Sequence, residues 1–136
     1  MDYFKLDDAL FETEFADCTL KPSRFNHEAH LRLAWIHINK YGLEKAIDQI
    51  SHQLMAYVDH HSSADKFNKT LTVAAIRVVH HFINKSSANT FQDFITEFPQ
   101  LKKDFKRLMA AHYTADIYNS PKAKREYMAP DLLPFT

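Results

Sequence analysis

Apolar side chains recur every three or four residues along most of this chain, the spacing of one face of an α-helix. No run of alternating apolar and polar residues bounded by turn residues is present, so no strand is predicted. The sequence therefore predicts an all-α fold, a single-domain bundle of about five to seven helices spanning residues 1–136. The expected helices cover 7–17, 26–41, 43–58, 68–83 and 90–95, a sixth that begins at Pro99 and carries Leu101 to Met109, and a last one from Pro121.

Residues at the predicted helix ends support these boundaries. Asn26, Thr90 and Ser120 are side chains of the kind that accept hydrogen bonds from the first turn of a helix. Gly42 is the residue type that most often follows a last helical turn. Pro121 suits the first helical position, because proline lacks the N–H that would be unpaired there. Prolines 130 and 134 predict an extended tail.

Composition narrows the classes of function. The 136 residues include 17 Lys plus Arg and 17 Asp plus Glu, so the formal net charge is zero. A nucleic-acid-binding protein or a protein of anionic membrane surfaces would carry a basic excess, so neither partner is expected. Gly42 is the one glycine. Because phosphate-binding loops and dinucleotide fingerprints require several glycines, those cofactor folds are excluded.

Three features predict a cytoplasmic protein. Cys18 is the one cysteine, so an internal disulfide cannot form. The start of the chain carries early acidic residues and lacks the basic and apolar regions of a signal peptide. No apolar run is long enough to cross a bilayer.

The most informative chemical feature is a pair of histidines, His27 and His30, in the first turns of the second predicted helix. Residues three or four apart share a helix face, so both imidazoles belong to the stripe that continues through Ala34 and Ile38. An inward-facing imidazole pair lines a small-molecule pocket, contributes to a metal site, or serves as a hydrogen-bonded part of the core. A metal would need further ligands, such as His112, Asp131 or Glu28, because two histidines alone are not a site.

Other candidates lie at helix ends. His112 and Tyr113 are adjacent and form either a proton donor–acceptor pair or a tyrosine packed with a wetted hydroxyl. Thr70 either faces a ligand or caps its own helix, and capping is the commoner role. Arg32 is a candidate clamp for an anion, one turn beyond Glu28 and close to the histidine pair.

Four blocks of the sequence together resemble a family of small all-helical bacterial proteins. They are Phe25-x-His27-x-x-His30-Leu31-Arg32-x-Ala34-Trp35, residues 66–72 with Thr70-x-Thr72, Leu101 through His112-Tyr113, and Ala123 through Pro130-Asp131-Leu132. The resemblance implies the fold and the candidate positions and implies no particular reaction. Where the family usually has Tyr-His before Thr-x-Thr, this chain has Phe67-Asn68, and asparagine is a poor metal ligand. That departure favours a hydrogen-bonding pocket over a metal site.

We therefore expect a soluble helical protein with a histidine-lined pocket for a small polar or aromatic molecule. His27, His30 and His112 are the candidate catalytic residues, and Arg32, Thr70, Tyr113 and Asp131 are the candidate ligand contacts. The sequence specifies no cofactor and leaves open whether the protein is an enzyme. Two further functions fit the same residues: a metal-binding protein that uses His27 and His30, and a non-enzymatic interaction module or homodimer.

Overall fold

The computed structural model describes residues 7–135, and in that range the chain forms helices and no strand, as predicted. The prediction that the chain starts without a signal peptide rests partly on residues 1–6, which lie outside the described residues. The helices are α1 (Asp8–Ala16), α2 (His27–Tyr41), α3 (Leu43–His61), α4 (Lys69–Ile83), α5 (Phe91–Glu97), α6 (Gln100–Lys103), α7 (Phe105–Ala110) and α8 (Pro121–Arg125), with short 3₁₀ turns η2 (Pro22–Arg24) and η3 (Ala64–Lys66).

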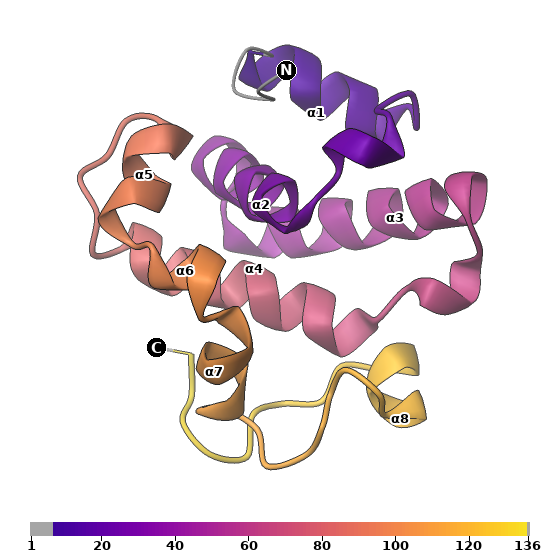
Figure 1. Ribbon diagram of the computed structural model, residues 1–136, viewed down its shortest axis with the longest axis vertical. Helices are drawn as coiled ribbons and strands as arrows, with labels where there is room; N and C mark the ends of the chain where they lie inside the picture. The colour runs from indigo at the N-terminus through magenta and orange to yellow at the C-terminus, as the bar shows by residue number, and fades with distance from the viewer. Residues whose placement is uncertain (1–6, 136) are drawn as a thin grey trace.

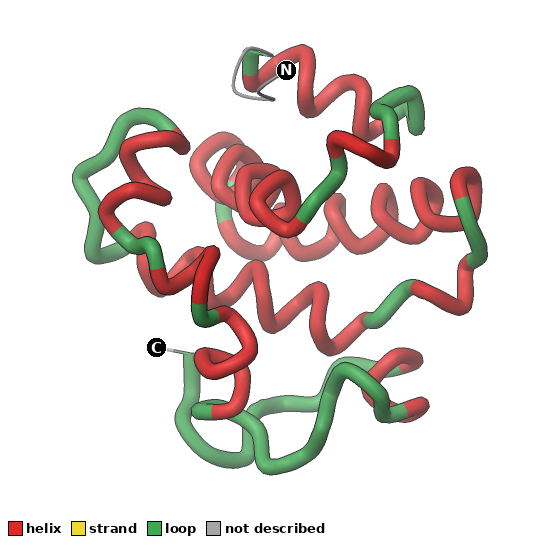
Figure 2. Tube along the Cα trace, viewed as in Figure 1, coloured by secondary structure: helices red, strands yellow, loops and turns green. Residues whose placement is uncertain are grey.

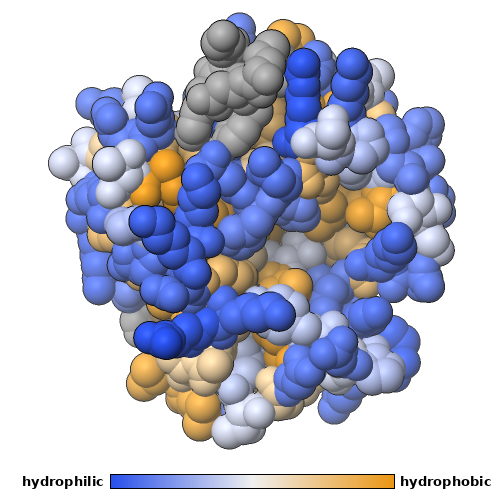
Figure 3. All heavy atoms as spheres, viewed as in Figure 1, coloured by the Kyte–Doolittle hydropathy of each residue, from blue (hydrophilic) through white to orange (hydrophobic). Residues whose placement is uncertain are grey.

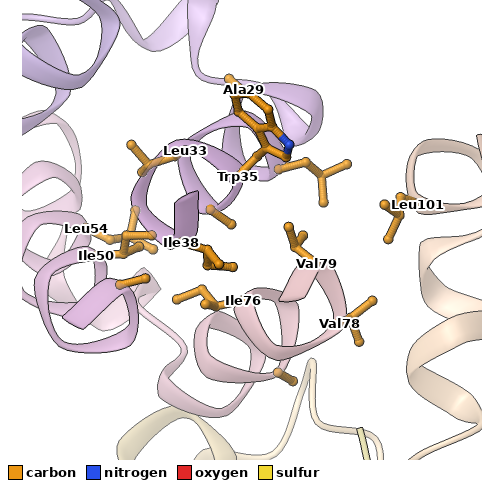
Figure 4. Close-up of a cluster of buried hydrophobic side chains, with 14 of the residues drawn as sticks. Ala29, Leu33, Trp35, Ile38, Ile50, Leu54, Ile76, Val78, Val79 and Leu101 are labelled. Carbon is orange, nitrogen blue, oxygen red and sulfur yellow. The ribbon is translucent and has the colours of Figure 1, made fainter. Parts of the chain in front are cut away.

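Three long helices, α2, α3 and α4, pack against one another and form the centre of the molecule. Figure 1 shows α1 lying across one end of this group, α5, α6 and α7 along one side, and α8 beside α4. Apolar side chains from the three long helices point towards one another in Figure 4, among them Leu33 of α2, Leu54 of α3 and Ile76 of α4. These three side chains are at most 8% exposed, so their apolar surface is removed from water and stabilises the bundle.

Helix α2 is enclosed on nearly all sides, because every residue from Leu31 to Ile38 is buried. The polar side chains of this stretch, Arg32 and His37, are therefore buried as well. Arg32 is 3% exposed, and its guanidinium pairs with the carboxylate of Asp8 on α1, with 2.8 Å between Nη2 and Oδ1. It also lies over the ring of Phe11, 4.7 Å from the ring centroid. A buried guanidinium is tolerated because these contacts replace its hydration.

Helix α1 is held by two phenylalanines that are fully buried, Phe11 and Phe15. The Phe15 ring lies 5.0 Å from the Phe25 ring and 5.3 Å from the Tyr57 ring, measured between centroids. The hydroxyl of Tyr57 donates to the carbonyl of Leu20 at 2.7 Å. The aromatic cluster therefore joins α1, the segment before α2 and the carboxyl-terminal half of α3.

The predicted caps are present. The side chains of Asn26, Thr90 and Ser120 accept hydrogen bonds from the backbone N–H three residues later, at 2.9, 3.1 and 3.2 Å. Gly42 ends α2 with a φ of 89°, a backbone conformation that side chains with a Cβ rarely adopt. Local sequence therefore sets these helix boundaries.

The sixth predicted helix is wrong in one respect, because the structure divides it into α6 and α7. Asp104 separates them with φ −125° and ψ 31°, outside the helical region. Aspartate is a weak helix former whose side chain competes for nearby backbone groups. The break gives the fold eight α-helices over residues 7–135, consistent with the predicted all-α bundle of about five to seven helices.

Two irregular segments, 111–120 and 126–135, lie together at the bottom of the view in Figure 2, where they are drawn green. They are held together by backbone hydrogen bonds, such as the one from Leu132 N–H to the carbonyl of His112 at 3.0 Å. The tail beyond α8 is not helical, as the prolines predict. Within residues 7–135, none of the helices combines the length and the apolar character needed to span a membrane.

We expect Phe15→Ala to lower the free energy of unfolding by about 3–5 kcal/mol, because it removes a fully buried ring from between two others. Urea unfolding followed by circular dichroism measures the change. Leu10→Ala is the matched control on the same helix, since Leu10 is 45% exposed, and its effect should stay within about 0.5 kcal/mol. Similar losses for the two variants would contradict the packing of α1 described above.

Candidate functional site

A cavity of about 380 Å³ lies between α2, α3 and α4, below the end of α2 that carries the two histidines. Its walls are mainly apolar and come from all three helices, including Leu31, Ile50, Leu54, Leu71 and Val79. In Figure 3, apolar side chains are visible between polar ones near the middle of the face drawn there. Cavities of this size lie within the usual range for small-molecule sites, about 300–1,000 Å³.

Small side chains explain why the helices leave this space. Ala34 on α2 and Ala75 on α4 both line the cavity, and these two helices pack against each other. Leucine or isoleucine at these two positions would fill part of this space. The cavity is therefore a consequence of residue size at two core-facing positions.

His30 lies at one end of the cavity with its ring stacked on Phe25, 3.9 Å between centroids and 17° between planes. The side chains of His27 and His30 are both exposed to solvent, and both also line the cavity. Desolvation by neighbouring protein atoms lowers the pKa of His30 to about 4, with a smaller contribution from the charge of His27. The imidazole is thus neutral at neutral pH.

Neither nitrogen of His30 has a hydrogen-bond partner within residues 7–135; the stacked Phe25 ring is its close contact. A neutral imidazole offers one N–H donor and one acceptor nitrogen. Both are left for a molecule that enters the cavity.

His27 has a different role, because one of its nitrogens is already engaged. Its Nε2 lies 3.0 Å from the carbonyl oxygen of Leu101 in α6, and its ring meets the Phe105 ring edge-on at 4.8 Å between centroids. A carbonyl can only accept, so Nε2 carries the proton, and neutral His27 has Nδ1 as an acceptor. The carbonyl of Leu101 is free to accept this bond because α6 ends at Lys103, and the last carbonyls of a helix have no partner within it.

An ion pair beside His27 strengthens this junction. Glu28 of α2 and Lys102 of α6 approach to 2.8 Å between Oε1 and Nζ. The first turn of α2 is thereby joined to α6 on one side of the cavity.

The remaining polar residues of the lining come from α4 and from the segments around it. Asn68 caps α4 and also donates from Nδ2 to the carbonyl of Ile117 at 2.8 Å. The hydroxyl of Thr72 donates to the carbonyl of Asn68 at 2.7 Å. Lys66 is exposed, and Tyr118 is half-buried, with Lys106 5.2 Å from the centroid of its ring. The amide and the threonine hydroxyl thus have internal partners, which leaves the imidazole of His30 as the group suited to a ligand.

The structure brings His27 and His30 together on the cavity and places the other five candidate residues elsewhere. Arg32 lies on a different face of α2, paired with Asp8. Two positions along a helix correspond to a rotation of about 200°, so Arg32 cannot share the direction of His30.

The other four candidates fasten the carboxyl-terminal segment. Thr70 donates from its hydroxyl to the carbonyl of Glu126 at 2.8 Å and accepts from the N–H of Met128 at 3.0 Å. The expectation that Thr70 caps its helix is wrong, because Asn68 performs that role. Tyr113 donates to the carbonyl of Met128 at 2.8 Å.

His112 and Asp131 belong to the same junction. His112 Nδ1 lies 2.7 Å from the carbonyl of Leu133, and the carboxylate of Asp131 accepts from both the N–H and the hydroxyl of Thr114. Burial raises the pKa of Tyr113 above its usual value, so its hydroxyl keeps its proton. These side chains have internal partners that explain their positions.

Sequence reasoning missed three residues of the site. Phe25 belongs to the histidine block but gave no sign that it would stack on His30. Asn68 occupies the position where the resemblance expects a histidine, which was a usable signal. Tyr118 lies in an irregular segment, where no periodicity indicates direction.

No group of three or more His, Cys, Asp or Glu side chains in residues 7–135 is arranged to hold a metal ion. His112, the third ligand considered from the sequence, bonds to Leu133 and is not part of the cavity lining. The arrangement of the described residues offers hydrogen bonding and an apolar enclosure.

Comparisons with protein-family models, with curated proteins and with solved structures found no match to this chain. The resemblance drawn from the four sequence blocks stays a prediction.

We expect Thr70→Val to lower the free energy of unfolding by about 1–3 kcal/mol, because the change of similar shape leaves two backbone groups of the tail without a partner. Hydrogen exchange at the amide of Met128 should also become faster. Thr96→Val is the control, since Thr96 is exposed and bonds only within its own helix, to Gln92. Unchanged stability and unchanged Met128 exchange would contradict the fastening role of Thr70.

We expect the His30 imidazole to titrate near pH 4, observable by NMR of its ring signals. The unfolded chain takes up this proton near pH 6.5, so the free energy of unfolding should fall as pH decreases from 6.5 towards 4. His37 acts in the same direction, because burial also lowers its pKa. His30→Gln should therefore make the fall shallower without abolishing it. A His30 titration above pH 6 would contradict the desolvation of the ring by its neighbours.

Proposed function

We propose that this protein binds a small, mostly apolar molecule in the cavity between α2, α3 and α4, with the polar end of the molecule on His30. The observation that carries the proposal is an unpartnered imidazole at one end of an apolar enclosure of about 380 Å³. Binding sites for small molecules commonly combine apolar walls with a few polar groups that fix orientation.

In this proposal the two histidines have different roles. The hydrogen bond from His27 to Leu101 holds the first turn of α2 against α6 and keeps that side of the cavity in place. His30 is fixed by stacking on Phe25, so its nitrogens are oriented before a ligand arrives. A polar group held in position in advance increases affinity, because less freedom is lost on binding.

An enzymatic role is the second candidate, favoured by the neutrality of His30. A neutral imidazole with a free nitrogen can accept a proton from a bound molecule, which is the first requirement of a general base. Binding comes first in either case, and the cavity supports binding directly.

A metal site and a protein–protein interface have less support. The metal site lacks a third ligand among the described residues. An interaction module or homodimer would use exposed apolar side chains, and the large ones among the described residues are Leu10, Met55, Leu132 and Leu133, too few to define an interface. We keep the cytoplasm as the proposed location, since Cys18 is free.

The test uses N-phenyl-1-naphthylamine, an uncharged fluorescent probe whose emission rises in apolar surroundings. We expect it to bind the wild-type protein and to bind Ala75→Phe at least tenfold more weakly, because the added ring occupies the cavity. Val58→Phe is a second filling variant, on α3. Ala56→Phe is the matched control, because Ala56 is an exposed residue of α3 outside the lining.

Thermal unfolding by circular dichroism identifies the variants that fold. Failure of the probe to bind the wild-type protein would contradict the proposed function. Equal binding by folded Ala75→Phe and Val58→Phe would place the probe on the surface and contradict it equally.

A further inference from the structure

The lining of the cavity is one-sided in charge. Three of its side chains can carry positive charge: His27, His30 and Lys66. No aspartate or glutamate of residues 7–135 lines it. Glu28, the nearest acid in sequence to both histidines, is paired with Lys102 on α6 instead. A negative group entering the cavity thus meets no like charge from the lining.

His30 is suited to hold such a group. Its ring lines the cavity, is stacked on Phe25, and is without a hydrogen-bond partner in the described residues. A carboxylate has only acceptor oxygens, and a protonated imidazole has only donors. In the free protein the ring is neutral near pH 7, because desolvation and the charge of His27 lower its pKa and no carboxylate of residues 7–135 lines the cavity. A carboxylate within hydrogen-bonding reach would supply that balance.

We propose that the ligand is an amphipathic monocarboxylate, bound with its carboxylate on His30 and its apolar chain or ring system between α2, α3 and α4. This rests on the proposed small-molecule function and adds the chemical class of the ligand. Lys66, exposed on η3, adds a second positive charge to the same cavity. The apolar walls favour a hydrocarbon body over a sugar or a nucleotide, which would leave many polar groups without partners there.

Binding of the anion takes up one proton. In the free protein His30 is neutral near pH 7, and the ligand is ionised. In the complex one proton from solution lies between the carboxylate oxygen and the imidazole nitrogen, so the charge of the complex rises by one relative to the separate partners. The other titratable groups that face the cavity are His27 from α2, Lys66 from η3 and Tyr118 from the segment after α7, while α3 and α4 contribute none.

The experiment displaces N-phenyl-1-naphthylamine from the full chain with decanoate, decanol and decylamine, which share a hydrocarbon body and differ in the head group. At pH 6 we expect decanoate to bind at least tenfold more tightly than decanol, and decylamine to bind most weakly. Between pH 8 and pH 6 the affinity for decanoate should rise by up to about tenfold per pH unit, while that for decanol stays constant.

His30→Gln separates the proton from the hydrogen bond, because glutamine donates and accepts without titrating in this range. We expect the variant to lose the pH dependence for decanoate and most of the preference for decanoate over decanol. His52→Gln is the matched control, since His52 is an exposed histidine of α3 whose ring nitrogen bonds the carbonyl of Asp48 on its own helix. Calorimetry of wild-type protein in two buffers of different ionisation enthalpy gives the proton uptake without any variant, and one proton per decanoate is expected.

The outcomes distinguish the two proposals. Displacement by decanol as effective as that by decanoate, or decanoate binding without proton uptake, would overturn the carboxylate proposal and leave the binding function standing. Absence of displacement by all three compounds would also overturn it. Failure of the naphthylamine to bind at all would remove the proposed function, and the carboxylate proposal with it.

Discussion

The packing of α2 against both α3 and α4 is the constraint on which the rest of the structure depends. Every residue from Leu31 to Ile38 is buried, so α2 is enclosed along two turns and cannot shift without exposing core. Apolar burial over that length fixes the direction of each side chain, including that of the buried Arg32, which points towards Asp8 on α1. The amino-terminal end of α2 is then presented above a space that the alanines of α2 and α4 do not fill. The place of both histidines in the cavity lining follows from this arrangement.

Two imidazoles one helical turn apart therefore have different chemistry. His27 is committed by its bond to Leu101, which exists because the chain leaves the helix at Asp104. His30 is left with a stacked ring and two free nitrogens. Desolvation by neighbouring protein atoms keeps it neutral near pH 7, and a neutral imidazole can take up a proton when an acid or anion binds. The candidate site thus combines a mainly apolar cavity with one imidazole that has no hydrogen-bond partner in residues 7–135.

Much of the fold could be predicted from the sequence, because caps and apolar spacing are local signals. Asn26 and Gly42 delimit α2 as expected, and Ser120 caps α8. The division at Asp104 was missed, since a continuous apolar stripe does not reveal a single residue that leaves the helical region. The spacing of His27 and His30 correctly predicted that they lie close together, and both line the cavity, but both are exposed to solvent and not buried as the spacing suggested. The roles of Thr70 and Asp131 could not be predicted from the sequence, because their partners, Glu126 and Thr114, come from irregular segments with no periodicity.

The most direct test of the account is the position of a bound apolar molecule, measured by intermolecular NOEs between N-phenyl-1-naphthylamine and the protein labelled at its methyl groups. The account predicts NOEs from methyls of the cavity wall, such as those of Leu54, Ile76 and Val79, contributed by both α3 and α4. NOEs confined to the exposed methyls of Leu132 and Leu133 would contradict it, because the probe would then lie on the surface and the cavity would be unused.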